Sequence, residues 1–191
     1  GTFWPVLGWT ITWAVVATAS NYVLGMLLAI LINRKGVRFK GLWRTVFVTS
    51  IAIPQFVSLL LMRNMLDDFG PINGVLQHLG LTSKFIPFLT NATFARLSVL
   101  VVNLWVGIPY SMLITSGILL SIPKELYEAA AIDGASPFRM WTKIILPYVV
   151  FVTGPYLITQ FIGNINNFNV IYLLTGGGPN SPNYYQAGST D

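Results

Sequence analysis

The sequence predicts an all-α integral membrane protein, and three features lead to that fold class. Hydrophobic residues make up 54% of the 191 residues and charged residues only 9%, whereas about a quarter of a soluble domain is charged. Several apolar stretches reach the length of roughly 20 residues that a helix needs to cross a bilayer. The Lys and Arg residues gather mainly between or at the ends of these stretches.

Four apolar stretches predict four transmembrane helices, over residues 6–32, 45–66, 95–120 and 148–174. The first is interrupted only by soft polar residues such as Asn21. The second contains Pro54 and the fourth contains Gly154-Pro155, and at both places we expect a kink. The chain does not start with Met. We expect it to be a fragment whose last helix would follow Asp191.

The distribution of basic residues predicts which loops face the cytoplasm. Five of the eleven Lys and Arg residues lie between positions 34 and 44, and three more lie in the loop 121–147. Only Arg63, Lys84 and Arg96 lie on the other side. Because Lys and Arg are enriched in cytoplasmic loops, we expect these two loops inside and the loop 67–93 outside. The basic residues do not interleave with aromatic ones on one face, which argues against nucleic-acid binding.

The loop 121–147 has the pattern of two short helices joined by a sharp turn. Pro123 and Glu125 suit a first helical turn, Gly134 suits a helix stop, and Ser136-Pro137 suits a second start. We therefore expect a bent helix pair on the cytoplasmic surface. A DNA-binding helix-turn-helix has a similar shape, but this segment is weakly basic and is joined to membrane helices at both ends.

The same loop carries a family resemblance. Glu128-Ala129-Ala130, Gly134, Ile144, Leu146 and Pro147 match the EAA loop in identity and spacing, so the chain resembles the permease subunits of ATP-binding-cassette (ABC) importers. The flanking segments 122–127, 166–168 and 174–179 are similar to the sugar branch of that family, especially the maltose/maltodextrin type. The resemblance implies that the bent pair is a coupling helix seated in a cleft of an ATPase subunit. The coupling residues it implies are Glu128, Ala129, Ala130, Asp133, Gly134, Pro137 and Arg139.

Further expectations follow from this resemblance. The partners would be cytoplasmic ATP-binding subunits, a second and different permease subunit, an extracytoplasmic solute-binding protein and a sugar ligand. ATP would be hydrolysed by the partner subunits, so the chain itself would not be an enzyme and would need no cofactor. It would be a multi-pass protein of the bacterial cytoplasmic (inner) membrane.

The fourth expected helix contains a polar stripe. Gln160, Gly163, Asn164 and Asn167 are spaced i, i+3, i+4 and i+7 and so share one face. Amides are costly in lipid, so this face should point to the bundle interior or to a water-filled cavity. An amide both donates and accepts hydrogen bonds and therefore suits the hydroxyls of a neutral sugar. Asn166 and Asn169 are expected to point away from the stripe and to bond to neighbouring helices.

The third expected helix has a matching stripe of Asn103, Val106, Gly107, Tyr110 and Ile114. Tyr110 offers an aromatic face and a hydroxyl to a sugar ring. The resemblance implies a sugar site at Val106, Gly107, Tyr110, Gln160, Gly163, Asn164 and Asn167. Gln160 and Gly163 are not the side chains usual in that family, which leaves the sugar open. The simpler interpretation is that the polar residues form hydrogen bonds between helices.

Other functions find less support in the sequence. Asp67-Asp68 and the single His78 do not form a metal site or a catalytic group, because no other ligand residues cluster with them and the chain has no Cys. An ion-coupled carrier would need ionisable residues inside the spans, and the interior of the expected spans holds none. The sequence is also compatible with an ABC permease for another solute and with a membrane assembly protein that has no transport activity.

Overall fold

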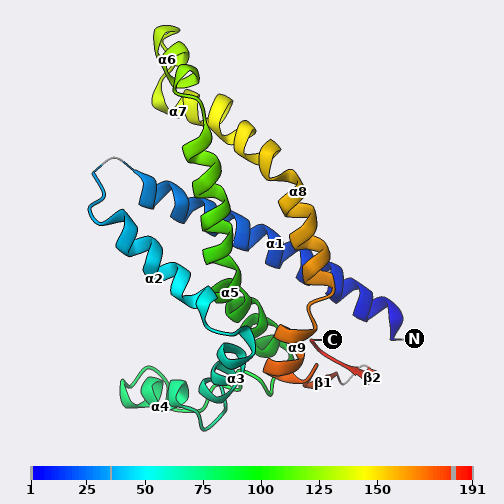
Figure 1. Cartoon of the computed structure of the whole chain (residues 1–191). Helices are drawn as coiled ribbons and strands as arrows, with labels where there is room; N and C mark the ends of the chain where they lie inside the picture. Colours follow the sequence, from blue (N-terminus) through cyan, green and yellow to red (C-terminus); the bar gives the residue numbers. More distant parts are fainter. Residues whose placement is uncertain (1, 35, 182–183, 191) are drawn as a thin grey trace.

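The computed structural model describes residues 2–34, 36–181 and 184–190 and is built almost entirely of helices (Figure 1). The helices are α1 (Phe3–Asn33), α2 (Lys40–Ala52), α3 (Gln55–Met65), α4 (Pro71–His78), α5 (Ala92–Ser121), α6 (Lys124–Ile132), α7 (Pro137–Met140), a π-helical turn (Trp141–Ile145), α8 (Leu146–Ile165) and α9 (Phe168–Thr175). Two short antiparallel strands follow, β1 (Asn180–Ser181) and β2 (Tyr184–Gly188). The all-α prediction therefore describes the body of the protein but misses this strand pair.

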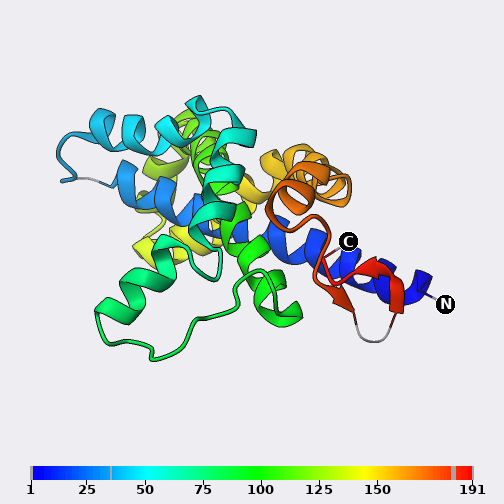
Figure 2. The same cartoon turned by 90° about the horizontal axis from the view of Figure 1, so that it is seen from below.

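The long helices have the dimensions of membrane spans. Within the described residues, α1, α5 and the segment Pro137–Thr175, which runs from α7 through α9, are each long and apolar enough to cross a bilayer, and the bent pair α2–α3 adds a fourth if it is counted as one span. Helices α6 and α7 lie at one end of the molecule, and α3, α4, α9 and the strands lie at the other (Figure 1). Seen from below, α4 and the strand pair project on opposite sides of the body (Figure 2).

Helix α1 packs against α5 mainly through small residues, and many of its large apolar side chains are exposed. Ala14, Ala17, Gly25 and Ala29 are buried, whereas large side chains on the other faces are exposed, among them Val15, Val23, Leu27 and Leu31. This distribution is the reverse of that in a helix of a soluble protein, which buries its large apolar side chains. It is typical of a membrane bundle, where lipid covers the large apolar side chains and small residues let two backbones approach.

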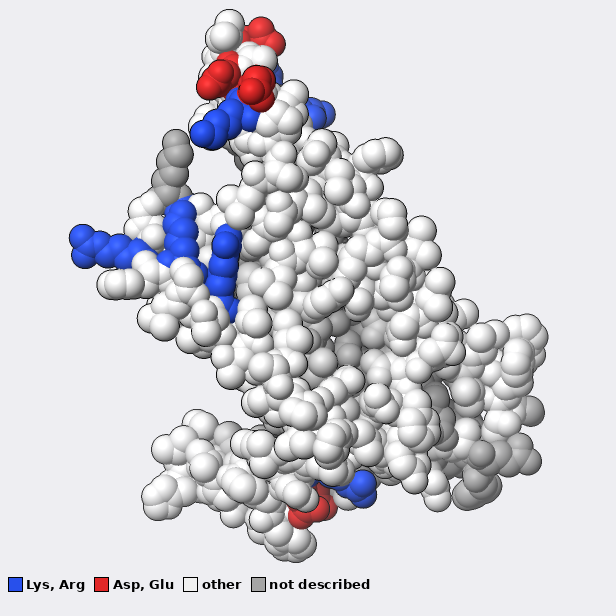
Figure 3. All heavy atoms as spheres, viewed as in Figure 1, with Lys and Arg blue, Asp and Glu red and all other residues white. Residues whose placement is uncertain are grey.

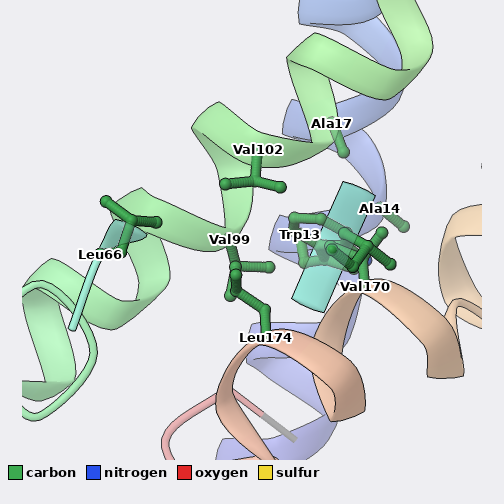
Figure 4. Close-up of a cluster of buried hydrophobic side chains, with 9 residues drawn as sticks. Trp13, Ala14, Ala17, Leu66, Val99, Val102, Val170 and Leu174 are labelled. Carbon is green, nitrogen blue, oxygen red and sulfur yellow. The ribbon is translucent and has the colours of Figure 1, made fainter. Parts of the chain in front are cut away.

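One glycine shows how close that approach is. A Cβ added at Gly25 would collide with the Cβ of Ser111 in α5 and would lie 2.9 Å from the backbone nitrogen of Met112. Any side chain at this position would therefore push α1 away from α5. Nearer the N-terminus of α1, the helices α1, α3, α5 and α9 meet at a buried cluster that contains Trp13, which is 1% exposed. The buried cluster there is Trp13, Ala14, Ala17, Leu59, Leu66, Val99, Val102, Val170 and Leu174 (Figure 4).

The second expected span, residues 45–66, is not one kinked helix. It is two helices, α2 and α3, that meet at 88°. Pro54 explains the break, because proline has no N–H for the helical ladder and its ring collides with the carbonyl four residues earlier. The residue before it, Ile53, has extended dihedral angles (φ −78°, ψ 129°), as a following proline favours. Helix α2 also starts earlier than expected, at Lys40.

The fourth expected span, residues 148–174, also differs in where it is interrupted. Helix α8 continues through Gly154 and Pro155, where the sequence predicts a kink, and ends at Ile165. A new helix, α9, begins at Phe168 with Asn167 as its N-cap, whose side chain accepts a hydrogen bond from the backbone N–H of Val170 (3.2 Å). The break therefore falls within the polar stripe predicted for this helix.

Candidate functional site

A cavity of about 610 Å³ lies between α1, the α2–α3 bend, α5 and the α8–α9 break. Its wall is formed by Asn21, residues 50–55, Ser58, Asn103, Val106, Gly107, Tyr110, Gln160, Gly163, Asn164, Asn166, Asn167, Phe168 and Asn169. The structure thus brings together all seven residues at which the family resemblance implies a sugar site, from α5 and from the region of α8 and the α8–α9 break, which are far apart along the chain. No Lys, Arg, Asp, Glu or His is among these lining residues.

The α8–α9 break gives the cavity its densest group of amides. Asn166 and Asn169 are among the lining residues as well, although the sequence predicts that they point away from the stripe. The Nδ2 of Asn166 donates to the carbonyl of Ile162 in its own helix (3.1 Å). Because the chain leaves helical geometry here, successive side chains no longer follow the i, i+3, i+4, i+7 pattern from which their directions were predicted.

Asn164 belongs both to the wall and to the packing of the helices. It is 6% exposed, and its Nδ2 donates to Thr18 Oγ1 of α1 (3.0 Å). Its backbone carbonyl accepts a hydrogen bond from Trp13 Nε1, also of α1 (2.9 Å). Asn164 therefore forms polar contacts between helices, as the simpler interpretation expects, and it also lines the cavity.

Helix α5 contributes Gly107, whose missing side chain makes room for Asn21 of α1. A Cβ at position 107 would lie 2.5 Å from Asn21 Cγ. Asn21 and Asn103 are each 4% exposed, and Asn21 Oδ1 and Asn103 Nδ2 are buried without a hydrogen-bond partner among the described residues. A buried polar atom without a partner costs about 1–3 kcal/mol. The wall therefore contains an acceptor and a donor whose hydrogen-bonding capacity is not used.

Tyr110 is the aromatic part of the wall. Its side chain is 46% exposed, and its ring centroid lies 5.8 Å from that of Tyr156 in α8. The Tyr156 hydroxyl is hydrogen-bonded to Ser111 Oγ (2.6 Å), which fixes the ring beside Tyr110. Ile114, the last member of the stripe predicted for this helix, is not part of the cavity wall.

The sequence did not predict two parts of the wall. Asn21 stands out in the sequence only as a soft interruption, although its spacing from Ala17 and Gly25 places it on the small-residue face that packs on α5. The α2–α3 bend, with Gln55 and Ser58, was not predicted to take part in a site. The signal that could have found it is Pro54, because a helix broken at membrane depth is tolerated only where protein or water covers the exposed backbone.

The second candidate region is the tip formed by α6 and α7. Gly134 ends α6 with φ +69°, and the N–H groups of Gly134 and Ala135 bond to the carbonyls of Ala131 (3.1 Å) and Ala130 (2.9 Å). This is the Schellman arrangement, in which a glycine adopts the left-handed conformation. Ser136 Oγ then accepts a hydrogen bond from the N–H of Arg139 (3.3 Å) and caps α7. The turn expected at Gly134 is therefore formed by local hydrogen bonds.

The tip presents its side chains to the outside. Of the residues expected to couple to an ATPase, Ala130 is buried, while the others are exposed, namely Glu128, Ala129, Asp133, Gly134, Pro137 and Arg139. Ile132 is 86% exposed and Phe138 77% exposed beside them. Figure 3 shows acidic and basic side chains side by side at this end, and a smaller charged group at the opposite end. Burial raises the pKa of the Tyr127 phenol above its ordinary value. The tip thus combines charge with uncovered apolar side chains, as a docking surface does.

Comparison with known proteins gives a consistent result. The sequence pattern of the family described as binding-protein-dependent transport system inner membrane component matches residues 21–185. The chain is 43% identical over 180 residues to the galactooligosaccharides transport system permease protein GanP of Bacillus subtilis (strain 168), covering 93% of this chain and 43% of GanP. It is 39% identical over 198 residues to the maltodextrin transport system permease protein MalC of Streptococcus pneumoniae serotype 4, covering 99% of this chain and 45% of MalC. The chain therefore spans less than half the length of these relatives.

A solved structure shares the fold. The crystal structure of a bacterial ABC transporter involved in the import of the acidic polysaccharide alginate superposes with a TM-score of 0.80 at 24% identity. The match covers 100% of this chain and 64% of the solved chain. At this level of identity the likeness concerns the arrangement of helices.

Proposed function

The chain belongs to the family of binding-protein-dependent transport system inner membrane components, and from that premise we propose that it is the core of a permease subunit in an ATP-driven importer of neutral oligosaccharides. The observation that carries the proposal is the polar, charge-free cavity between the long apolar helices. Its volume of about 610 Å³ lies in the range of sites for small ligands, roughly 300–1,000 Å³.

The lining favours an uncharged solute. Amides, hydroxyls and Tyr110 supply hydrogen bonds and an aromatic face, which suit the hydroxyls and ring faces of a sugar. An acidic sugar would bring carboxylates into a wall without Lys or Arg, and a buried charge without a partner is strongly unfavourable. We therefore place the substrate with the galactooligosaccharides and maltodextrins of GanP and MalC and not with alginate.

The α6–α7 tip is proposed as the coupling element. Glu128, Ala129, Asp133, Gly134, Pro137 and Arg139, together with the buried Ala130, would seat in a cleft of a cytoplasmic ATP-binding subunit. ATP would be hydrolysed by that subunit, a second permease subunit would complete the path, and an extracytoplasmic binding protein would deliver the sugar. The setting would be a bacterial cytoplasmic membrane, crossed several times by the complete chain.

The test uses the complete transporter in proteoliposomes with its ATPase and binding protein. ATP hydrolysis is measured with maltodextrins, galactooligosaccharides and alginate oligosaccharides. We expect stimulation by at least one of the two neutral classes and none by the acidic one. Stimulation by alginate alone would overturn the assignment of a neutral substrate, and uptake that continues without ATP but stops with a proton ionophore would favour an ion-coupled carrier.

A further inference from the structure

A group of basic residues at the junction of α1 and α2 is not used by the proposed transport function. This basic loop, as we call it, covers residues 34–44, its described cations are Arg34, Arg38, Lys40 and Arg44, and the chain contains no Asp or Glu before Asp67. Its charge therefore has no counterpart nearby in the sequence. Figure 3 shows these basic side chains at the edge of the molecule, apart from the acidic group at the α6 tip.

Two of the four cations are held in place by the end of α1. Lys40 Nζ donates to the backbone carbonyl of Asn33 (3.0 Å), and an Arg44 guanidinium N–H donates to Asn33 Oδ1 (2.5 Å). Asn33 itself donates to Ser116 Oγ of α5 (3.0 Å). The Nε of Arg44 is buried without a hydrogen-bond partner in the described part of the chain. Hydrogen bonds through Asn33 thus attach the basic loop to the α1–α5 pair.

The other two cations, Arg34 and Arg38, are exposed. Neither forms an ion pair with a described carboxylate. A guanidinium offers five N–H donors in a planar arrangement that matches a phosphate group. The loop therefore presents unused donors and positive charge to its surroundings.

Apolar side chains border these charges. Phe39 is 75% exposed, Leu42 61% and Trp43 49%. Phe39 is the only non-glycine residue with positive φ in the described chain (φ 57°), a conformation that costs an ordinary residue roughly 1–2 kcal/mol. Its carbonyl nevertheless accepts the first hydrogen bond of α2, from the N–H of Trp43 (3.1 Å). The backbone of Phe39 is thus strained, and its exposed side chain follows Arg38 directly in the sequence.

We propose that the basic loop binds the phosphate group of anionic phospholipids, with Arg34 and Arg38 contacting the phosphate and with Phe39 and Leu42 against the upper acyl chains. Basic clusters next to a membrane helix attract anionic lipids, and aromatic side chains are enriched at the level of the headgroups. The large exposed side chains that follow on α2, such as Val46, continue the apolar surface into the bilayer. The proposal depends on the membrane setting and not on what the cavity carries.

The competing occupant is an acidic surface of a partner protein, such as the ATP-binding subunit. A soluble partner would leave Phe39, Leu42 and Trp43 beside water unless it also covered them. The lipid bilayer covers both the charges and the apolar ring at once, because its phosphates and acyl chains are adjacent. The experiment must therefore measure lipid binding and subunit association in the same preparation.

The probe is phosphatidylglycerol, and the protein is the full-length permease assembled with its partner subunits. Phosphatidylglycerol retained after extraction from mixed phosphatidylcholine vesicles is quantified by native mass spectrometry. We expect the Arg34→Gln/Arg38→Gln variant to bind phosphatidylglycerol roughly thirtyfold more weakly, from the typical contribution of each cation near an anionic surface. Binding should persist in Arg34→Lys/Arg38→Lys, which keeps both charges.

The matched control is Arg63→Gln/Lys84→Gln, which removes two exposed cations outside the basic loop and should leave phosphatidylglycerol binding unchanged. Inorganic phosphate at the same concentration should not displace the lipid, because it lacks acyl chains. The proposal is overturned if the Arg34→Gln/Arg38→Gln variant keeps its phosphatidylglycerol, if inorganic phosphate displaces the lipid, or if that variant loses the ATP-binding subunits while lipid binding is unchanged.

Discussion

The cavity wall and the α6–α7 tip are built in opposite ways. The wall takes side chains from α1, the α2–α3 bend, α5 and the α8–α9 break, and several of them are almost fully buried, such as Asn21, Asn103 and Asn164. The tip is one continuous stretch of chain, and nearly all of the residues proposed for coupling are exposed. The wall is therefore held by packing between helices, whereas the tip is shaped by its own caps and is accessible to a partner.

This difference predicts that substitutions in the two regions will impair different properties of the protein. A change at the tip should leave the fold and the cavity intact and interrupt transport only. A change in the wall should alter sugar binding or helix packing, depending on whether the new atoms enter the cavity or a neighbouring helix.

The largest effect is expected at the tip. We expect Glu128→Ala to lower ATP-driven sugar uptake by roughly thirtyfold, the loss typical of removing a central interface contact. Membrane insertion and sugar binding by the assembled permease should be unchanged, because Glu128 is exposed. Uptake into proteoliposomes measures transport, and pull-down of the ATP-binding subunit measures whether the variant still associates with it. Glu125→Ala, an exposed carboxylate of the same helix, is the matched control, and normal uptake by the Glu128 variant would refute the coupling role.

A smaller effect on uptake is expected at a wall position whose new side chain would enter the cavity. A Cβ at Gly163 has no atom within 4 Å, so Gly163→Leu places its side chain in the cavity and should reduce oligosaccharide uptake about tenfold. Gly154→Leu is the control, because Gly154 is in the same helix, also has free space at its Cβ, and is not part of the wall. Equal uptake by the two variants would show that the cavity is not the route of the sugar.

The smallest effect is one of stability and distinguishes packing from cavity lining within the wall. Gly107→Ala places a Cβ against Asn21 and should lower the free energy of unfolding by about 1–3 kcal/mol, as overpacking does. Gly163→Ala, with open space at its Cβ, should not lower it. Thermal unfolding in detergent provides the measurement. Adding Asn21→Ala to Gly107→Ala should recover most of the loss, and a loss that is independent of Asn21 would contradict this contact.

The same contrast explains how much could be predicted from the sequence. The tip follows local rules, so Gly134 as a helix stop and Ser136 as a cap could be predicted from their neighbours, and both have the expected hydrogen bonds. The two predicted polar stripes also contain eight residues of the wall, because helical periodicity is local, and only Ile114 of the stripes lies outside it. Asn21 and the α2–α3 bend could not be assigned to the wall in this way, since their place depends on contacts between distant segments.

The interruptions of the expected spans have a related cause. Pro54 is predicted to kink a helix and instead separates two helices, while Pro155, where a kink or irregularity is predicted, lies inside α8. Both prolines look alike in the sequence, and only the surrounding helices decide whether the freed backbone groups find partners. The break at Asn166 and Asn167 is stabilised by the Asn167 cap, whereas the spacing of Asn167 predicts a member of a continuous helical stripe.

Occupation of the cavity by a neutral oligosaccharide can be tested at one position of the wall. Because this chain contains no Cys, Gly163→Cys introduces a single thiol into it there. The measurement is the rate at which a small maleimide labels Cys-containing peptides of this chain in the assembled transporter, with and without the sugar that stimulates ATP hydrolysis. We expect the sugar to slow labelling at position 163 and to leave a Gly154→Cys variant unaffected. Labelling at position 163 that proceeds at the same rate with and without the sugar would contradict its binding in this cavity.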